Sequence, residues 1–128
     1  MSNFPIPSNN LTHLIISALF EAYNEMGYGY QEKHYYRAIL AKLIEKGLKV
    51  QEQLLCRIVI SGKIIGRYYL DFLVANDLGK VVLEIKVANA VYPQHIKQVL
   101  NYLKANNLKL GLIGVISKSG VIIKRVIN

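Results

Sequence analysis

The sequence predicts an α/β domain built on a mixed central β-sheet flanked by helices, with the element order ααβββαββ. Two stretches of helical periodicity come first, and three stretches of strand-like alternation follow. One more helical stretch then precedes two short apolar runs at the end of the chain. Residues 1–128 are expected to form a single domain, and 52% of them are hydrophobic, which is enough to bury a sizeable core.

The first helix is predicted over residues 11–26, after the candidate N-caps Ser8, Asn9 and Asn10 and before Gly27. Its apolar stripe is Leu11, Leu14, Ile15, Ala18, Leu19, Ala22 and Met26. A second helix is predicted over residues 31–46. Its expected buried stripe is Tyr36, Ile39, Leu40, Leu43 and Ile44. Glu32 lies one turn before Tyr36, so its carboxylate is expected to face the interior.

Three strands are predicted over residues 50–61, 63–75 and 80–87. Ser61-Gly62 marks the first turn, Gly66 marks a bulge, and residues 76–79 (Asn-Asp-Leu-Gly) form the second loop. Pro93 opens a third helix that ends near Asn106. Two strands, over residues 110–116 and 121–127, complete the chain.

Charged side chains interrupt two of the apolar strands. Alternation places Glu84 and Lys86 on one face of the third strand. With Ala75 facing Lys80 across the second loop, Asp71 is expected opposite Glu84, with Cβ atoms about 5 Å apart. Two carboxylates at that distance repel unless a proton or a cation lies between them, and a divalent metal ion is the simplest solution. The spacing also fits a plain ion pair of Lys86 with Glu84 or Asp71, and spacing alone favours that alternative.

An Asp on one strand and Glu-x-Lys on the next resemble the pattern of the PD-(D/E)XK phosphodiesterase superfamily. Residues 29–35, Gly-Tyr-Gln-Glu-Lys-His-Tyr, resemble the GxxExxY signature of one family within it. Residues 95–104 resemble the distal H-x-x-Q-x-x-x-Y-L helix of that family. The resemblance spans about residues 10–128 and implies a restriction-endonuclease-like core.

The resemblance implies a metal-dependent nuclease that hydrolyses phosphodiester bonds, with DNA the more frequent substrate in the superfamily. Asp71 and Glu84 would bind Mg²⁺ or Mn²⁺ together with the backbone carbonyl of Ile85, and Glu32 would act on the metal through a water. Lys86 would hold the attacking water or neutralise the charge at phosphorus. Gln98 and Tyr102 would position the site. The expected catalytic residues are therefore Glu32, Asp71, Glu84, Lys86, Gln98 and Tyr102.

The alternative function is a non-catalytic nucleic-acid-binding or scaffold module that keeps the fold. The presence of all six residues favours the enzyme. A formal charge of +8, from 16 Lys and Arg against 8 Asp and Glu, indicates nucleic acid or another phosphate-rich partner rather than solubility alone. One site that cuts a duplex commonly requires two copies, which suggests a homodimer.

Other classes find little support in the composition. Cys56 is the only cysteine, so an internal disulfide and a cysteine-based zinc site are excluded, and a buried, inert thiol is expected. No apolar stretch is long enough to span a membrane. The first ten residues lack the pattern of a secretory signal, and a cytoplasmic protein is expected.

Overall fold

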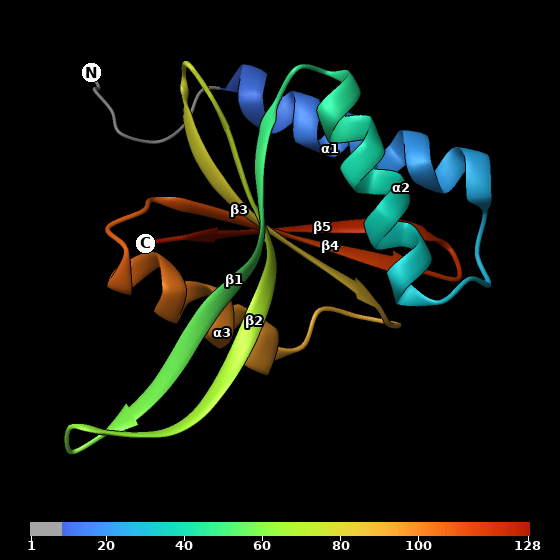
Figure 1. The fold of residues 1–128 in the computed structure, drawn as a ribbon. Helices are drawn as coiled ribbons and strands as arrows, with labels where there is room; N and C mark the ends of the chain where they lie inside the picture. Colours follow the sequence, from blue (N-terminus) through green and yellow to red (C-terminus); the bar gives the residue numbers. More distant parts are fainter. Residues whose placement is uncertain (1–8) are drawn as a thin grey trace.

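A computed structural model describes residues 9–128 and has the predicted order of elements (Figure 1). The helices are α1 (Asn9–Met26), α2 (Glu32–Glu45) and α3 (Pro93–Ala105). The strands are β1 (Lys49–Ile60), β2 (Lys63–Asn76), β3 (Gly79–Val87), β4 (Leu110–Ser117) and β5 (Gly120–Ile127). Ser8 and the residues before it, on which the secretory-signal expectation rests, lie outside the described residues. Asn9 and Asn10 were also expected as N-caps, and this was wrong, because both lie within α1.

The five strands form one sheet in the order β1-β2-β3-β4-β5. β3 and β4 are parallel and are connected through α3, whereas the other neighbouring pairs are antiparallel. The predicted α/β class with a mixed sheet is therefore confirmed, and it is consistent with a restriction-endonuclease-like core. In the described part of the chain, no helix combines the length and the apolar character needed to span a membrane.

The helices cover the two faces of the sheet (Figure 1). α1 and α2 pack on one face, in a core that includes Phe72, Leu83 and Ile85. α3 packs on the other face, in a core that includes Leu70 and Val82. β4 is buried along its whole length because both of its faces are covered. The alternation predicted for β3 is confirmed by this division of its side chains.

The buried stripe of α2 differs from the predicted one. Tyr35, Ile39 and Leu43 are fully buried, whereas Ile44 is 58% exposed, so its prediction as a core residue was wrong. Ile39 and Leu43 were predicted correctly, and Tyr35 completes the buried row at spacings of four residues. Tyr36 and Leu40 therefore lie at the margin of this face and are only partly buried, and Ile44 lies outside it.

The turns of the three-strand meander lie where they were predicted. Ser61 and Gly62 both have positive φ (50° and 77°), as a two-residue hairpin turn requires. The β1–β2 register shifts between Ile58 and Val59, which leaves Ile65 as an extra residue beside Gly66, at the predicted bulge. Across the second turn, the predicted Ala75–Lys80 pairing is confirmed.

The contact between α3 and β4 depends on a glycine. A Cβ at Gly111 would lie 2.5 Å from Cγ1 of Val99 on α3. Gly111→Ala should therefore lower the free energy of unfolding by about 1–3 kcal/mol, measured by chemical denaturation. Gly66→Ala is the matched control, since its Cβ would make only ordinary contact with Ile58, 3.4 Å away. Equal stability of the two variants would contradict this description of the packing.

Candidate active site

Asp71 and Glu84 lie just beyond the end of the hydrogen-bonded pairing between β2 and β3. The ladder between the strands runs from Asn76–Gly79 to Phe72–Leu83, so the predicted register brings Asp71 and Glu84 to the next position. At this position, hydrogen bonds from backbone amides to the two carboxyl groups replace the hydrogen bonds between the strands. The amide of Asp71 donates to Oε1 of Glu84 over 2.9 Å, and the amide of Ile85 donates to Oδ2 of Asp71 over 2.8 Å. Each carboxyl group is thereby fixed by the opposite strand.

The neighbouring strand β1 is distorted at the same level. Its pairing with β2 includes Glu52–Phe72 and Leu54–Leu70, and Gln53 between them has a positive φ of 56°, which is uncommon for a residue other than glycine. Leu70 packs on the α3 side of the sheet, whereas Phe72 packs on the α1–α2 side. The hairpin therefore twists at this level, and Asp71 lies between the two layers.

Burial and mutual repulsion weaken the acidity of this carboxyl pair. Glu84 is 3% exposed, and burial together with the charge of Asp71 raises its pKa to about 8. Burial also raises the pKa of Asp71, against the opposing effect of the hydrogen bond from the Ile85 amide. At neutral pH without a cation, the carboxyl pair therefore retains one proton. A divalent cation could take the place of that proton.

Lys86 supplies the positive charge beside this pair. Its Nζ lies 3.4 Å from Oε2 of Glu84, and its side chain is 28% exposed. Burial alone would lower the pKa of Lys86, but the attraction of Glu84, Glu32 and Asp71 outweighs it and raises the pKa. Lys86 is therefore an ammonium ion that can donate hydrogen bonds but cannot accept a proton at neutral pH.

Residues 29–35 hold Glu32 at the end of β3. Gly29 has a φ of 119°, which allows the chain to turn between α1 and α2. The hydroxyl of the buried Tyr35 donates to the carbonyl of Gly27 and fixes this turn. Glu32, in the first turn of α2, accepts a hydrogen bond from the Val87 amide over 2.9 Å. The expectation that Glu32 faces the interior was wrong, because the residue lies in the first turn of α2 at the edge of the domain and is exposed, but its carboxylate reaches the end of β3.

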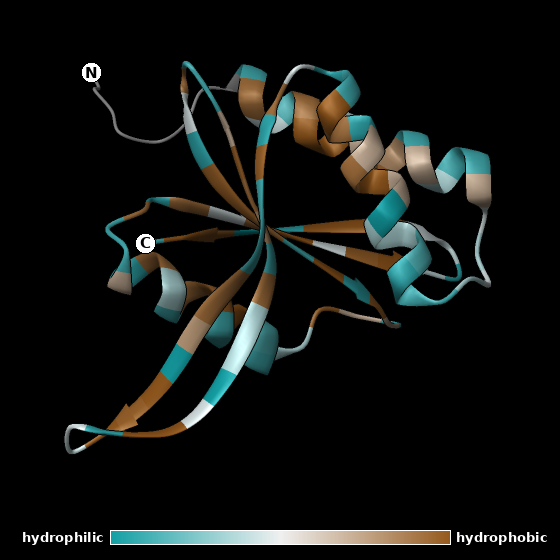
Figure 2. Ribbon diagram, in the orientation of Figure 1, coloured by the Kyte–Doolittle hydropathy of each residue, from teal (hydrophilic) through white to brown (hydrophobic). Residues whose placement is uncertain are grey.

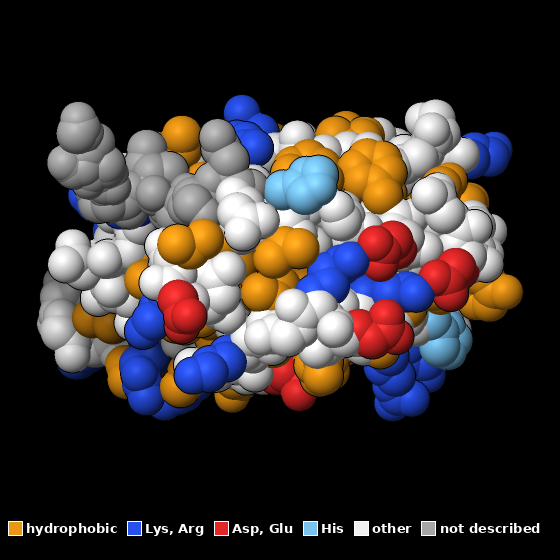
Figure 3. Space-filling model, turned by 90° about the horizontal axis from the view of Figure 1, so that it is seen from above, with side chains coloured by type: hydrophobic (Ala, Val, Ile, Leu, Met, Phe, Trp, Pro, Cys, Tyr) orange, Lys and Arg blue, Asp and Glu red, His pale blue; other side chains and the backbone are white. Residues whose placement is uncertain are grey.

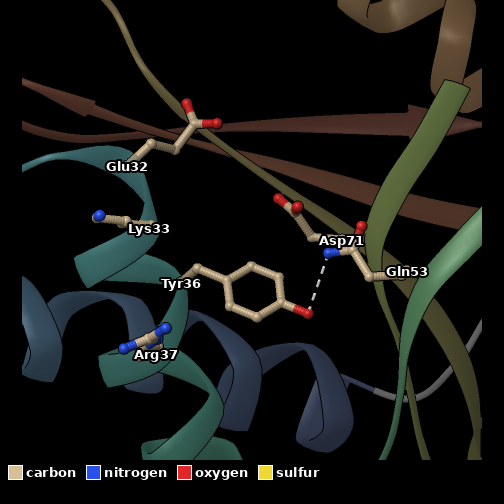
Figure 4. Close-up of a pocket in the computed structure, with 6 residues that line it drawn as sticks. All are labelled: Glu32, Lys33, Tyr36, Arg37, Gln53 and Asp71. Atoms are coloured by element: carbon tan, nitrogen blue, oxygen red, sulfur yellow. Dashed lines mark hydrogen bonds between the residues drawn. The ribbon is translucent and has the colours of Figure 1, made fainter.

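A cavity of about 310 Å³ opens between α2 and the distorted part of the sheet. It is lined by Glu32, Lys33, Tyr36, Arg37, Gln53 and Asp71 (Figure 4). Gln53 donates to the hydroxyl of Tyr36 over 3.2 Å, which closes one side of the cavity. Lys33 and Arg37 are exposed, and the ammonium group of Lys33 points away from Asp71 (Figure 4). The sequence reasoning missed these two cations, although their spacing of four residues on a helix was a usable signal.

The residues predicted on α3 are only partly gathered at this site. His95 lies near enough that Lys86 acts on its acidity: burial, followed by the charge of Lys86, lowers the pKa of His95. Gln98 accepts a hydrogen bond from Tyr68 through its backbone carbonyl, over 2.9 Å. Tyr102 lines a different cavity, of about 320 Å³, beside Cys56. The structure thus brings together Asp71, Glu84, Lys86 and Glu32, and it places Tyr102 elsewhere.

The carboxyl pair has the donor chemistry of a magnesium site. Within residues 9–128, no group of three or more His, Cys, Asp or Glu side chains is gathered around a point that could hold a metal ion. Mg²⁺, however, commonly keeps several waters and binds through one or two carboxylates together with substrate phosphate. A pair of buried carboxyl groups therefore supplies as many protein ligands as such a Mg²⁺ site needs.

Comparison with known proteins agrees with this fold. The model of the PD-(D/E)XK nuclease superfamily matches residues 9–125, and the chain belongs to this superfamily. A superfamily of nucleases implies a nucleic-acid substrate, and its members generally use divalent metal ions.

Two further comparisons add little. No curated protein matches the chain. Among solved structures, the crystal structure of SSO0001 is similar, with 16% sequence identity, a TM-score of 0.49, and coverage of 94% of this chain and 79% of that chain.

Proposed function

We propose that the protein is a divalent-metal-dependent nuclease, with DNA as its substrate and Mg²⁺ or Mn²⁺ at Asp71 and Glu84. The observation that carries the proposal is the pair Asp71 and Glu84, in which each carboxyl group accepts a hydrogen bond from an amide of the opposite strand. Two carboxyl groups held by each other's backbone, with raised pKa values and an ammonium group 3.4 Å from one of them, are costly to fold. A buried arrangement of this kind is typical of a functional site.

The proposed division of labour follows from the protonation states. Asp71, Glu84 and the carbonyl of Ile85 hold the ion, and Glu32 contributes through a water. When bound, the ion neutralises charge on the phosphate and lowers the pKa of a coordinated water. Because Lys86 remains an ammonium group, it orients that water or stabilises the charge that develops on the phosphate oxygens, and it does not remove a proton. Lys33 and Arg37 attract the nucleic-acid backbone to the cavity.

The finer assignment to the GxxExxY family is part of the same proposal. It is supported by the parts that Gly29, Glu32 and Tyr35 play in the turn before α2 and in its contact with Val87. A homodimer that cuts both strands of a duplex stays a prediction.

Metal titration tests the assignment of the ligands. In isothermal calorimetry, wild type should bind Mn²⁺, and Asp71→Ala should lose at least about a hundredfold in affinity because half of the carboxylate pair is removed. Asp77→Ala is the matched control, since Asp77 is exposed in the β2–β3 turn. Equal Mn²⁺ affinity in wild type and Asp71→Ala would overturn the site. The non-catalytic alternative instead predicts nucleic-acid binding and no nicking of supercoiled DNA with any divalent ion.

A further inference from the structure

The β1–β2 hairpin extends beyond the rest of the sheet (Figure 1). β2 pairs with β3 only through residues 72–76, whereas its pairing with β1 continues to Lys63 at the turn. We call residues 57–67 the projecting hairpin. All of them except Gly66 are exposed. The projecting hairpin is therefore an arm whose sides are available to a partner.

Two arginines face each other across this arm. Arg57 and Arg67 are directly paired between the strands, and both are exposed. Like charges in that position destabilise a hairpin. Neither arginine forms an ion pair with an acidic side chain of the described chain. Lys63 adds a third positive charge at the turn, and the sequence has no Asp or Glu between Glu52 and Asp71. The arm therefore carries repulsion that a polyanion would relieve.

On the α1–α2 face, unlike on the arm, positive side chains have acidic neighbours. Basic and acidic side chains lie beside one another there (Figure 3), and they include the ion pairs Lys42–Glu25 and Lys46–Glu21. Charge on this face is largely balanced locally. By contrast, the sequence contains no Asp or Glu after Glu84, and the projecting hairpin contains none. The excess positive charge is thus placed away from the α1–α2 face.

Strand β2 connects the arginines of the arm to the candidate active site. Arg67, Tyr69 and Asp71 occupy alternate positions of β2, and Tyr69 is 55% exposed. At about 3.3 Å per residue, Arg67 lies about 13 Å along the strand from Asp71. That distance equals about four steps along a DNA duplex. A duplex lying along this row would therefore reach the carboxyl pair.

The end of the arm is apolar (Figure 2). Its exposed hydrophobic residues are Ile58 (44%), Val59 (52%), Ile60 (57%), Ile64 (46%) and Ile65 (64%). The major groove of B-DNA is about 12 Å wide and admits a two-stranded β-ribbon. Apolar side chains can contact bases and sugars in a groove while arginines reach the phosphates beside it. Arginines at the stem and β-branched residues at the end match these two requirements.

We propose that the projecting hairpin binds double-stranded nucleic acid in a groove, with Arg57, Arg67 and Lys63 on phosphates, and directs the duplex to Asp71. The proposal rests on the proposed function only for the reaction at Asp71, because binding by the arm does not require cleavage. It names a duplex as the substrate class, since a single strand has no groove for the apolar end.

The test compares two double variants that remove the same charge. Arg57→Ala/Arg67→Ala alters the arm, and Lys124→Ala/Arg125→Ala alters exposed residues of β5, the opposite edge strand. Binding to a labelled duplex of about 30 base pairs is measured by fluorescence anisotropy in EDTA, so that nothing is cleaved. The arm variant should lose at least about tenfold in affinity, and the slope of log K against log salt should fall by about 1.8. The control should lose less than about threefold. The thermal midpoint of the arm variant should stay equal or rise, since the repulsion is removed.

The apolar end is tested separately with Ile65→Asp, in the exposed bulge. It should weaken duplex binding more than binding of the matching single strand. Equal losses in the two double variants would overturn the proposal. If wild type sediments as a dimer and Ile65→Asp dissociates it, the apolar end contacts a second copy, which would also overturn the proposal. If wild type floats with anionic vesicles and Ile65→Asp abolishes this flotation, the apolar end contacts a lipid surface, with the same consequence.

Nicking of supercoiled DNA with Mg²⁺ is measured in parallel and keeps the two proposals apart. A wild type that binds duplex through the arm but never cuts would refute the proposed nuclease activity and support duplex binding by the arm. If wild type cuts and Arg57→Ala/Arg67→Ala binds duplex normally, duplex binding by the arm is refuted and the proposed nuclease activity is supported.

Discussion

Lys86→Ala should lower metal-dependent cleavage at least about a hundredfold while the affinities for Mn²⁺ and for nucleic acid change less than about threefold. The carboxyl groups hold the cation, whereas the ammonium group acts on charge that develops only during the reaction, so binding alone does not need it. Nicking of supercoiled DNA measures the first effect, and calorimetry and anisotropy measure the others. Lys80→Ala, an exposed lysine near the start of the same strand, is the matched control.

A purely structural role for Lys86 predicts a different pattern. Loss of one partner from a buried ion pair would cost about 3 kcal/mol. Because the pKa of Glu84 is raised to about 8, however, Glu84 can keep a proton at neutral pH and the cost should be smaller. A variant that melts much earlier, from a wild type that shows no cleavage with any divalent ion, would support the structural ion pair and the scaffold alternative.

Glu84→Gln should stabilise the metal-free protein above about pH 8 and abolish its response to Mg²⁺. The Glu84 carboxyl releases its proton near pH 8 when folded and near pH 4.5 when unfolded. Its favourable contribution is therefore complete below about pH 4.5 and is lost as the pH rises to about 8. A glutamine at this position cannot ionise, yet its carbonyl oxygen can still accept the hydrogen bond from the Asp71 amide.

Thermal melting in EDTA across this pH range measures the difference. The midpoint of wild type should fall as the pH rises, and that of Glu84→Gln should fall much less. Added Mg²⁺ should raise the midpoint of wild type at about pH 8 and leave the variant nearly unchanged. Identical pH profiles for the two proteins would show that Glu84 ionises normally in the folded state.

Much of the fold followed from local patterns in the sequence. Alternation divided the side chains of β3 between two cores, and the turn after Ala75 set the register that brings Asp71 next to Glu84. Both inferences rest on short-range geometry, which the chain specifies itself. The buried stripe of α2 was harder to predict, because apolar residues lie on both sides of it, and Ile44 was consequently assigned to the core.

The features that were not predicted depend on contacts between distant segments. The positive φ of Gln53 and the twist beside Asp71 arise from the way the hairpin joins two layers, and no residue pattern marks them. Tyr36 and Gln53 line the cavity because α2 crosses β1 and β2 at this level. The position of Tyr102 beside Cys56 likewise depends on the angle at which α3 crosses the sheet. Sequence spacing alone does not determine such angles.

A crystal of the protein soaked in Mn²⁺ would show whether Asp71 and Glu84 form a site for a divalent ion. We expect an anomalous peak within coordination distance of both carboxyl groups, and no such peak in Glu84→Gln crystals soaked in the same way. A wild-type crystal with no anomalous density there, and with the two carboxyl groups still hydrogen-bonded to the opposite strands, would contradict this assignment.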